Sequence, residues 1–275
     1  MVLDFLDRLD RSLERSNSLL CVGLDPDPAL MPRSLPGGKR AAGLERFLLE
    51  VIERTMPSAG AFKMQLASYL NYGPDGLDVL RAITRQIGRR RVTILDLKAN
   101  DFPNTMRLYH DAVFSHYGFD AVTLTPWMGR DSLEPFVTDR AHGVFLVAHS
   151  SNPGSADLQD PPRSKRPLWL EVVRWARRFQ EGNGNTGVVV GATYPEAVAR
   201  ARRVLGPAAP ILVPGIGAQG GALEACVRRG TGRGGRALLV AASRSILYAS
   251  RGADWAEAAA REAASLSDRI NALRP

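Results

Sequence analysis

Short runs of β-branched and other apolar residues alternate with segments of helical spacing along this chain, and no other feature constrains its fold as strongly. The short runs predict eight strands, at residues 18–23, 60–64, 92–97, 120–125, 144–148, 186–190, 210–213 and 237–241. Helical periodicity lies between most of them, at residues 44–56, 76–87, 105–117, 167–180, 195–205 and 222–229. Such alternation requires a parallel sheet with right-handed crossovers, and eight repeats favour closure of that sheet. We therefore predict an α/β fold, a (β/α)8 TIM barrel that forms a single domain over residues 1–275.

The length and composition suit one barrel. A chain of 275 residues is a usual size for this fold, and an apolar fraction of 45% supplies its core. The Pro- and Ser-rich stretch 151–167 is interpreted as a long loop and a candidate lid, not as a linker between domains. Residues 1–18 have helical spacing, unlike a signal peptide, and no run approaches the roughly 18 apolar residues of a membrane span. We expect neither export nor membrane insertion.

The net charge of +8 and the two cysteines indicate which binding partners and which cellular compartment to expect. The positive residues are scattered, so a solvated surface is favoured over nucleic-acid binding, and mild attraction of an anionic substrate stays open. Cys21 and Cys226 lie far apart in apolar patterns, which argues against a disulfide and against a thiolate metal site. These features predict a protein of the reducing cytoplasm that binds no nucleic acid.

Lysine is rare in this chain and its placement is informative. Of the 36 cationic side chains only four are lysines, and Lys63 and Lys98 occupy strand-like contexts. Arginine keeps its proton near neutral pH, whereas lysine can release it. The two lysines therefore call for a chemical explanation before an electrostatic one.

Acidic residues accompany these lysines at the end of the third predicted strand. A period of two places Asp96 and Lys98 on one face there, Asp101 follows three residues later, and Lys63 closes the second strand. The carboxyl ends of barrel strands form the active site in this fold, so the four charges are expected to converge. Ion pairs that only support packing are the alternative, but buried pairs at best break even in free energy. We favour a catalytic cluster.

A second set of polar residues follows the last two predicted strands. Residues 214–221 form a glycine-rich turn that leads into a helix, and Ser243 and Arg244 follow the eighth strand. Barrels often bind phosphate with these two loops, through backbone N–H groups and a helix N-terminus. Glycines can also serve turn geometry alone, and Arg244 could be a surface cation. The two loops together favour a phosphate site.

The stretch Asp96-Leu97-Lys98-Ala99-Asn100-Asp101 resembles the Asp-x-Lys-x-x-Asp signature of the orotidine 5'-monophosphate decarboxylase suprafamily. Further similar stretches occur in the same order and spacing at residues 22–26, 62–65, 151–154, 190–193, 214–221 and 243–246. The resemblance covers nearly the whole chain and is to the longer bacterial form of the decarboxylase. It implies conversion of orotidine 5'-monophosphate to uridine 5'-monophosphate, the last step of pyrimidine nucleotide synthesis, without a cofactor or a metal ion.

The resemblance also implies roles for residues. Lys63, Asp96, Lys98 and Asp101 correspond to an alternating catalytic tetrad, in which Lys98 protonates C6 of the pyrimidine. Asp101 and Thr105 would complete the site of a partner subunit, so a homodimer is expected. Asp25 would bind a ribose hydroxyl and Ser151 the pyrimidine. Gln219 and Arg244 match the phosphate-contacting glutamine and arginine of the family, and Gly220, Gly221 and Ser243 lie in the same two loops and are predicted to bind substrate with them.

This chain departs from the family pattern at a few places. Leu97, Ala99, Asn100 and Phe102 occupy the variable positions of the signature, where another sequence is common, and the tetrad itself is intact. Unusual residues also stand at Trp127 and at His149-Ser150, near the expected base and lid contacts.

Two other functions stay open. Mg²⁺-dependent relatives, 3-keto-gulonate 6-phosphate decarboxylase and hexulose-6-phosphate synthase, resemble one another in placing an acid at the end of strand two. Lys63 stands there in this chain and would repel a divalent cation. A non-catalytic barrel that binds nucleotide or RNA is the remaining alternative, and the intact charged cluster argues against it.

Overall fold

The computed structural model describes residues 4–35, 41–161, 167–216 and 220–275. Its centre is a closed barrel of parallel strands in sequence order, in which β1 pairs with both β2 and β8. All eight predicted strands, and with them the (β/α)8 fold, are confirmed. The strands are β1 (Leu20–Gly23), β2 (Ala61–Gln65), β3 (Val92–Ala99), β4 (Ala121–Leu124), β5 (Gly143–His149), β6 (Thr186–Val190), β7 (Ile211–Pro214) and β8 (Leu238–Ala242).

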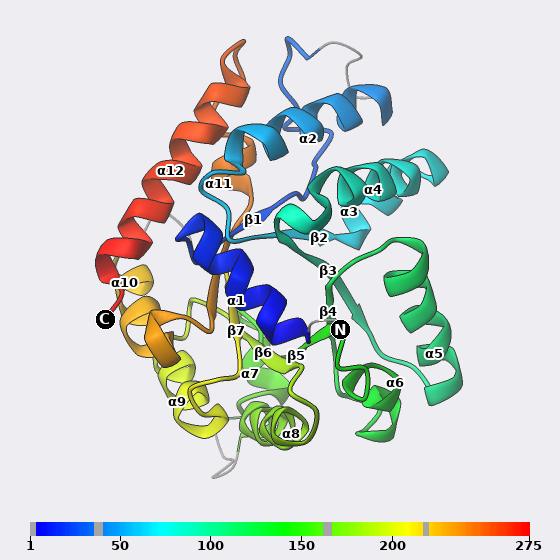
Figure 1. The fold of residues 1–275 in the computed structure, drawn as a ribbon, viewed down its shortest axis with the longest axis vertical. Helices are drawn as coiled ribbons and strands as arrows, with labels where there is room; N and C mark the ends of the chain where they lie inside the picture. Colours follow the sequence, from blue (N-terminus) through cyan, green and yellow to red (C-terminus); the bar gives the residue numbers. More distant parts are fainter. Residues whose placement is uncertain (1–3, 36–40, 162–166, 217–219) are drawn as a thin grey trace.

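Helices surround the barrel in a ring (Figure 1). The predicted helices are all present, and the one expected at 105–117 divides into α5 and a π-helical turn over Ala112–His116. The long helices of the ring are α2 (Ala41–Thr55), α4 (Pro74–Ile87), α5 (Pro103–Asp111), α8 (Leu168–Asn183), α9 (Pro195–Leu205), α10 (Gly220–Gly230) and α12 (Trp255–Leu273).

The core lies inside the barrel and between the barrel and this ring. Every residue of β5 is buried, because one strand face meets the barrel interior and the other meets helices. Helix α2 buries Leu44, Phe47, Leu48 and Val51 at helical spacing. Each such side chain contributes roughly 1.5–3 kcal/mol when it leaves water, so the ring and the barrel stabilise each other.

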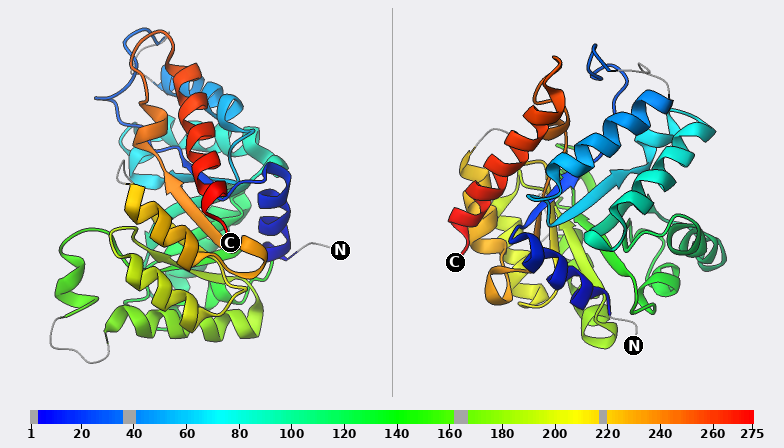
Figure 2. Two further views of the ribbon diagram at one scale, coloured as in Figure 1. Left: turned by 90° about the vertical axis from the view of Figure 1, so that its left-hand side faces the viewer. Right: turned by 45° about the horizontal axis from the view of Figure 1, so that its top comes forward.

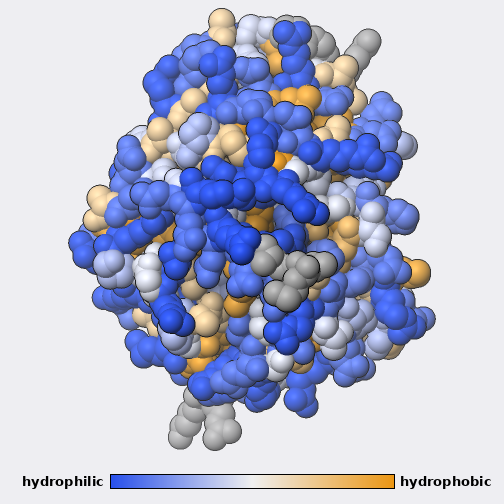
Figure 3. All heavy atoms as spheres, viewed as in Figure 1, coloured by the Kyte–Doolittle hydropathy of each residue, from blue (hydrophilic) through white to orange (hydrophobic). Residues whose placement is uncertain are grey.

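Helix α1 (Phe5–Ser16), expected within residues 1–18, covers the amino-terminal end of the barrel (Figure 1). The Phe5 ring packs edge-on against Phe145 with centroids 6.2 Å apart, and it leaves no room for a side chain at Gly143. The Ser12 hydroxyl donates to the Gly60 carbonyl at 2.7 Å. The outer surface at this end is mainly hydrophilic (Figure 3). The opposite end, which carries the segments after β1 and β5 (Figure 2), is therefore where a site can form.

Several helices were not predicted. Helix α12 packs on α2, where the ring centroids of Trp255 and Phe47 lie 5.1 Å apart. The buried residues Ala259, Ala263 and Ile270 of α12 do have helical spacing. The stretch 151–167, interpreted as a loop, contains one helical turn in its described part. The short helices are α3 (Leu66–Leu70), α6 (Glu134–Val137), α7 (Ser155–Leu158) and α11 (Arg244–Leu247).

Two expectations from composition can be compared with the described part of the chain. Cys21 and Cys226 are buried free thiols, as expected. None of the helices described is both long enough and apolar enough to cross a membrane.

Candidate active site

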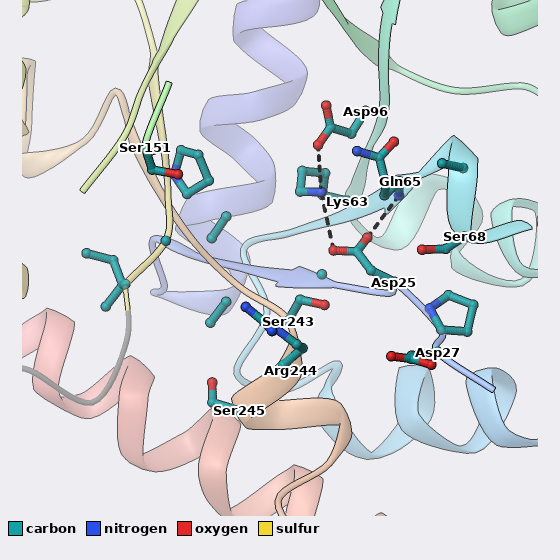
Figure 4. A pocket seen from close by; sticks show the side chains of 18 of the residues that line it. Asp25, Asp27, Lys63, Gln65, Ser68, Asp96, Ser151, Ser243, Arg244 and Ser245 are labelled. Carbon is teal, nitrogen blue, oxygen red and sulfur yellow. Dashed lines mark hydrogen bonds and ion pairs between the residues drawn. The ribbon is translucent and has the colours of Figure 1, made fainter. Parts of the chain in front are cut away.

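Four charged side chains of alternating sign form a row toward the carboxyl ends of β1, β2 and β3, and Figure 4 shows three of them, Asp25, Lys63 and Asp96. Lys63 Nζ lies 3.0 Å from Asp96 Oδ2 and 3.5 Å from Asp25 Oδ2. Lys98 Nζ lies 2.5 Å from Asp96 Oδ1. Neighbouring strands bring these residues together, because Gly23 pairs with Lys63 and Gln65 with Asp96. We call Asp25, Lys63, Asp96 and Lys98 the charged row.

Burial and mutual attraction set the protonation of the row. Burial alone would raise the pKa of Asp96, but the Lys63 and Lys98 ammonium groups and hydrogen bonds from Lys98 and Thr123 outweigh it and lower this pKa to about 2. Burial pulls the pKa of Lys63 down, yet Asp25 and Asp96 raise it above its usual value. Asp96 and Lys63 are therefore both ionised at neutral pH.

Thr123 of β4 and Thr125, which follows this strand, fix the geometry around Asp96 and Lys98. The Thr123 hydroxyl donates to Asp96 Oδ1 at 2.7 Å and accepts the Lys98 backbone N–H at 3.2 Å. The Thr125 hydroxyl donates to the Lys98 carbonyl at 3.2 Å. Sequence reasoning missed Thr123, since a threonine in a β-rich run carries no distinct signal.

Lys98 departs from regular strand geometry. Its φ is +53°, which is uncommon for a residue with a side chain, and the β3–β4 register shifts between Leu95 and Ala99. The expected alternation of side chains between the two faces of β3 therefore holds as far as Asp96 and is broken at Lys98. The Lys98 ammonium group still reaches Asp96. Such backbone strain persists only where surrounding contacts enforce it, here the hydrogen bonds of the Lys98 backbone with Thr123 and Thr125.

Asp101 and Thr105 lie apart from the charged row of their own chain. Asp101 Oδ1 accepts the Phe102 backbone N–H at 2.7 Å, and within the described residues it forms no ion pair with lysine or arginine. Thr105 lies in the first turn of α5. Their expected role in a partner's site stays a prediction.

The charged row lies beside a cleft of about 910 Å³; Lys98 contacts Asp96 but is not among the described residues that line this cleft. Asp25, Lys63 and Asp96 line one part of it, and Ser243 and Arg244, which follow β8, line another (Figure 4). The cleft is large enough for a nucleotide, whose charged and uncharged parts would meet different walls.

The loops around the cleft approach one another closely. A side chain at Gly23 would meet the Ser243 Cβ at 2.6 Å, and one at Gly191 would meet the Ser151 Cα at 2.7 Å. Gly215, which follows β7, has φ +87°. These glycines let Ser151 and Ser243 come up to the cleft.

Four of the eight predicted binding residues border this cleft. Asp25, Ser151, Ser243 and Arg244 line it directly. The Ser243 hydroxyl oxygen is buried and has no hydrogen-bond partner among the described residues, so it is available to a ligand. Gly220 and Gly221 open helix α10, and Gln219 lies outside the described residues.

The structure adds one relation that the sequence did not predict. Asp25, expected only to bind ribose, also lies beside Lys63 and holds the Gln65 backbone N–H at 2.9 Å. Its position after β1 was visible in the sequence, but its distance to Lys63 depends on the register of β1 with β2.

Comparison with known proteins agrees with this geometry. Residues 18–261 match the model of the Orotidine 5'-phosphate decarboxylase / HUMPS family. The orotidine 5'-phosphate decarboxylase of Roseiflexus castenholzii is 44% identical over 272 residues, which is 98% of each chain. That of Thermomicrobium roseum is 42% identical and covers 99% of this chain and 96% of its own.

Solved structures give the same result. The OMP decarboxylase of Leishmania donovani is 36% identical, with a TM-score of 0.83 and coverage of 99% of both chains. A putative orotidine-monophosphate decarboxylase from Toxoplasma gondii is 31% identical, with a TM-score of 0.86 over 98% of this chain and 96% of its own. The sequence match, the shared barrel and the charged row at its mouth lead to one conclusion: this chain belongs to the Orotidine 5'-phosphate decarboxylase / HUMPS family.

Proposed function

We propose that this protein decarboxylates orotidine 5'-monophosphate to uridine 5'-monophosphate, the last step of pyrimidine nucleotide synthesis, without a cofactor. The observation that carries the proposal is the charged row, of which Asp25, Lys63 and Asp96 line the same cleft as Ser243 and Arg244. Residues 1–275 would act as one domain. We place the reaction in a reducing cytoplasm, which suits the free thiols of Cys21 and Cys226.

The charged row can perform the chemistry of this reaction. When the bond from C6 to the carboxylate breaks, the electron pair stays on C6 as a carbanion, which fixed positive charge stabilises. Lys98 Nζ supplies that charge and then gives its proton to C6. Asp96 holds both ammonium groups and lies beside the departing carboxylate, while Lys63 keeps Asp96 ionised.

Contacts away from C6 would hold the substrate. Arg244 and Ser243 take the 5'-phosphate together with the glycine-rich turn and the start of α10, where Gln219, Gly220 and Gly221 lie in the sequence. Asp25 accepts a hydrogen bond from a ribose hydroxyl, and Ser151 contacts the pyrimidine. These contacts supply binding energy that can be realised in the transition state.

A homodimer would complete the site. Asp101 and Thr105 lie outside the charged row of their own chain, on a segment whose Phe102 and Leu108 side chains are 64% and 70% exposed. The amide nitrogen of Asn100 is buried without a partner among the residues described. Exposed apolar side chains and an unsatisfied donor on one segment suit an interface with a second copy.

A metal-dependent reaction on a sugar phosphate is the rival within this family. Lys63 lies within β2, two residues before its end, and its ammonium would repel a divalent cation next to Asp25 and Asp96. Turnover of orotidine 5'-monophosphate in excess EDTA, followed by loss of orotate absorbance, separates the two. The proposal expects full activity in EDTA. No turnover of orotidine 5'-monophosphate, together with Mg²⁺-dependent decarboxylation of 3-keto-gulonate 6-phosphate, would favour the rival.

A further inference from the structure

His149 is a buried titratable residue at the cleft end of the barrel that the proposed chemistry does not use. It ends β5, and its side chain is 2% exposed. Its ring lies 4.2 Å from the Tyr194 ring and 5.5 Å from the Trp169 ring, measured between centroids. A histidine so enclosed between two aromatic side chains has one position available to it.

The segment after His149 carries Ser151 to the cleft. Its backbone is tied down at several points: Gln159 Oε1 accepts the Ser150 N–H at 2.8 Å, and the Tyr194 hydroxyl lies 3.1 Å from Ser155 Oγ. Thr193 Oγ1 donates to the Ser151 carbonyl at 3.2 Å. Ser151 therefore lies in a segment held by several contacts, one of them from Tyr194, whose ring also packs on the His149 ring.

Asp160 closes the far end of the same segment over His149. Its Oδ2 atom lies 3.9 Å from His149 Nε2, and its side chain is 52% exposed. Among the described residues, Asp160 is the charged group that faces the His149 ring. Trp169 of α8 and Tyr194, which precedes α9, are neutral and pack on the same ring. Nδ1 faces the Ser150 carbonyl at 3.3 Å.

We propose that His149 is a positioning residue for the reaction proposed above: its buried ring, packed on Trp169 and Tyr194, fixes residues 150–160 and so sets the place of Ser151 in the cleft. The inference rests on the proposed function, because Ser151 matters through the nucleotide that it contacts.

The proposal has a consequence for pH. Burial lowers the pKa of His149 from its ordinary value of 6.5, although the Ser150 carbonyl and Asp160 act in the other direction. The neutral ring is therefore the form that fits. The support it gives to the segment is complete above pH 6.5 and is lost as pH falls through the lowered pKa.

The test compares variants in steady-state kinetics with orotidine 5'-monophosphate. Ser151→Ala and His149→Gln should each raise KM about five- to tenfold, the loss of about one hydrogen bond, with a smaller change in kcat. Because His149 acts through Ser151, the double variant should be no worse than either single one. His116→Gln, at an exposed histidine, is the matched control and should leave KM unchanged.

The pH dependence supplies a readout that a general loss of stability would not change. Wild-type KM should rise below pH 6.5, and His149→Gln should remove that rise. Asp160→Asn, at an exposed residue that folding tolerates, should move the rise to lower pH, because it removes the carboxylate that favours the protonated ring. Additive effects of Ser151→Ala and His149→Gln, or a KM for His149→Gln equal to that of the wild type, would overturn the proposal.

Hydrogen exchange separates this proposal from the proposed function. Peptides that cover residues 150–158 should exchange faster in His149→Gln than in the wild type or in His116→Gln, whatever the activity. Unchanged exchange would overturn the positioning role. A wild-type protein without turnover but with faster exchange in His149→Gln would contradict the proposed function and support the positioning role.

Discussion

Replacing Asp96 by Asn tests whether the two lysines stabilise its charge. Asp96 is 13% exposed, and its pKa falls from 3.8 to about 2 in the folded protein. A shift of that size corresponds to about 2.5 kcal/mol. Asp96→Asn should therefore lower the free energy of unfolding at pH 7 by about 2.5 kcal/mol, and the melting temperature by about 5–10 °C for a chain of this length.

The sign of the pH dependence follows from the lowered pKa. The stability that Asp96 contributes is present above its unfolded pKa and is lost as pH falls through about 2. Urea unfolding of the wild type and of Asp96→Asn should differ most at pH 7, and the difference should shrink to about half by pH 3. Asp268→Asn, on the exposed face of α12, is the control and should stay within about 0.5 kcal/mol of the wild type. A difference for Asp96→Asn that stays constant from pH 7 to pH 3 would refute the reasoning.

Three further outcomes are expected. Arg244→Ala should lower kcat/KM about 10- to 100-fold, because the substrate loses a charge-assisted hydrogen bond. The melting temperature should stay unchanged, because Arg244 is exposed. A near-normal kcat/KM would contradict its role. Asp101→Asn and Lys98→Ala should each be inactive, and mixing them should restore about a quarter of the wild-type sites, whereas no recovery would argue against a shared site. Thr123→Val should cost about 1 kcal/mol in urea unfolding, because Asp96 loses a donor, and an unchanged free energy of unfolding would show that this hydrogen bond is dispensable.

The barrel could be predicted because each strand has a local sequence pattern that can be recognised without its neighbours. Strands buried on both faces become apolar runs such as β5, and helices that cover them show an apolar stripe such as that of α2. Helix α12 was missed because its buried face is built of small residues, among them Ala259 and Ala263, which give little contrast in hydrophobicity. Short helices such as α7 have too few residues for any period to be recognised.

Only those site residues could be predicted whose position near a strand end was visible in the sequence. Lys63 and Asp96 lie two and three residues before the carboxyl ends of the adjacent strands β2 and β3, so their meeting follows from the fold. The contact of Asp25 with Lys63 and the support of Asp96 by Thr123 depend on strand register, which no local pattern encodes. The left-handed backbone of Lys98 is likewise a product of tertiary contacts with β4.

The central claim is that the charged row carries out decarboxylation, and one measurement tests it most directly. Purified protein is incubated with orotidine 5'-monophosphate in excess EDTA, loss of the orotate chromophore is followed, and the product is identified. The account predicts steady conversion to uridine 5'-monophosphate by the wild type, and a loss of at least about 100-fold in Lys98→Ala, which keeps the fold but lacks the ammonium. No turnover by the wild type, or equal turnover by Lys98→Ala, would contradict it.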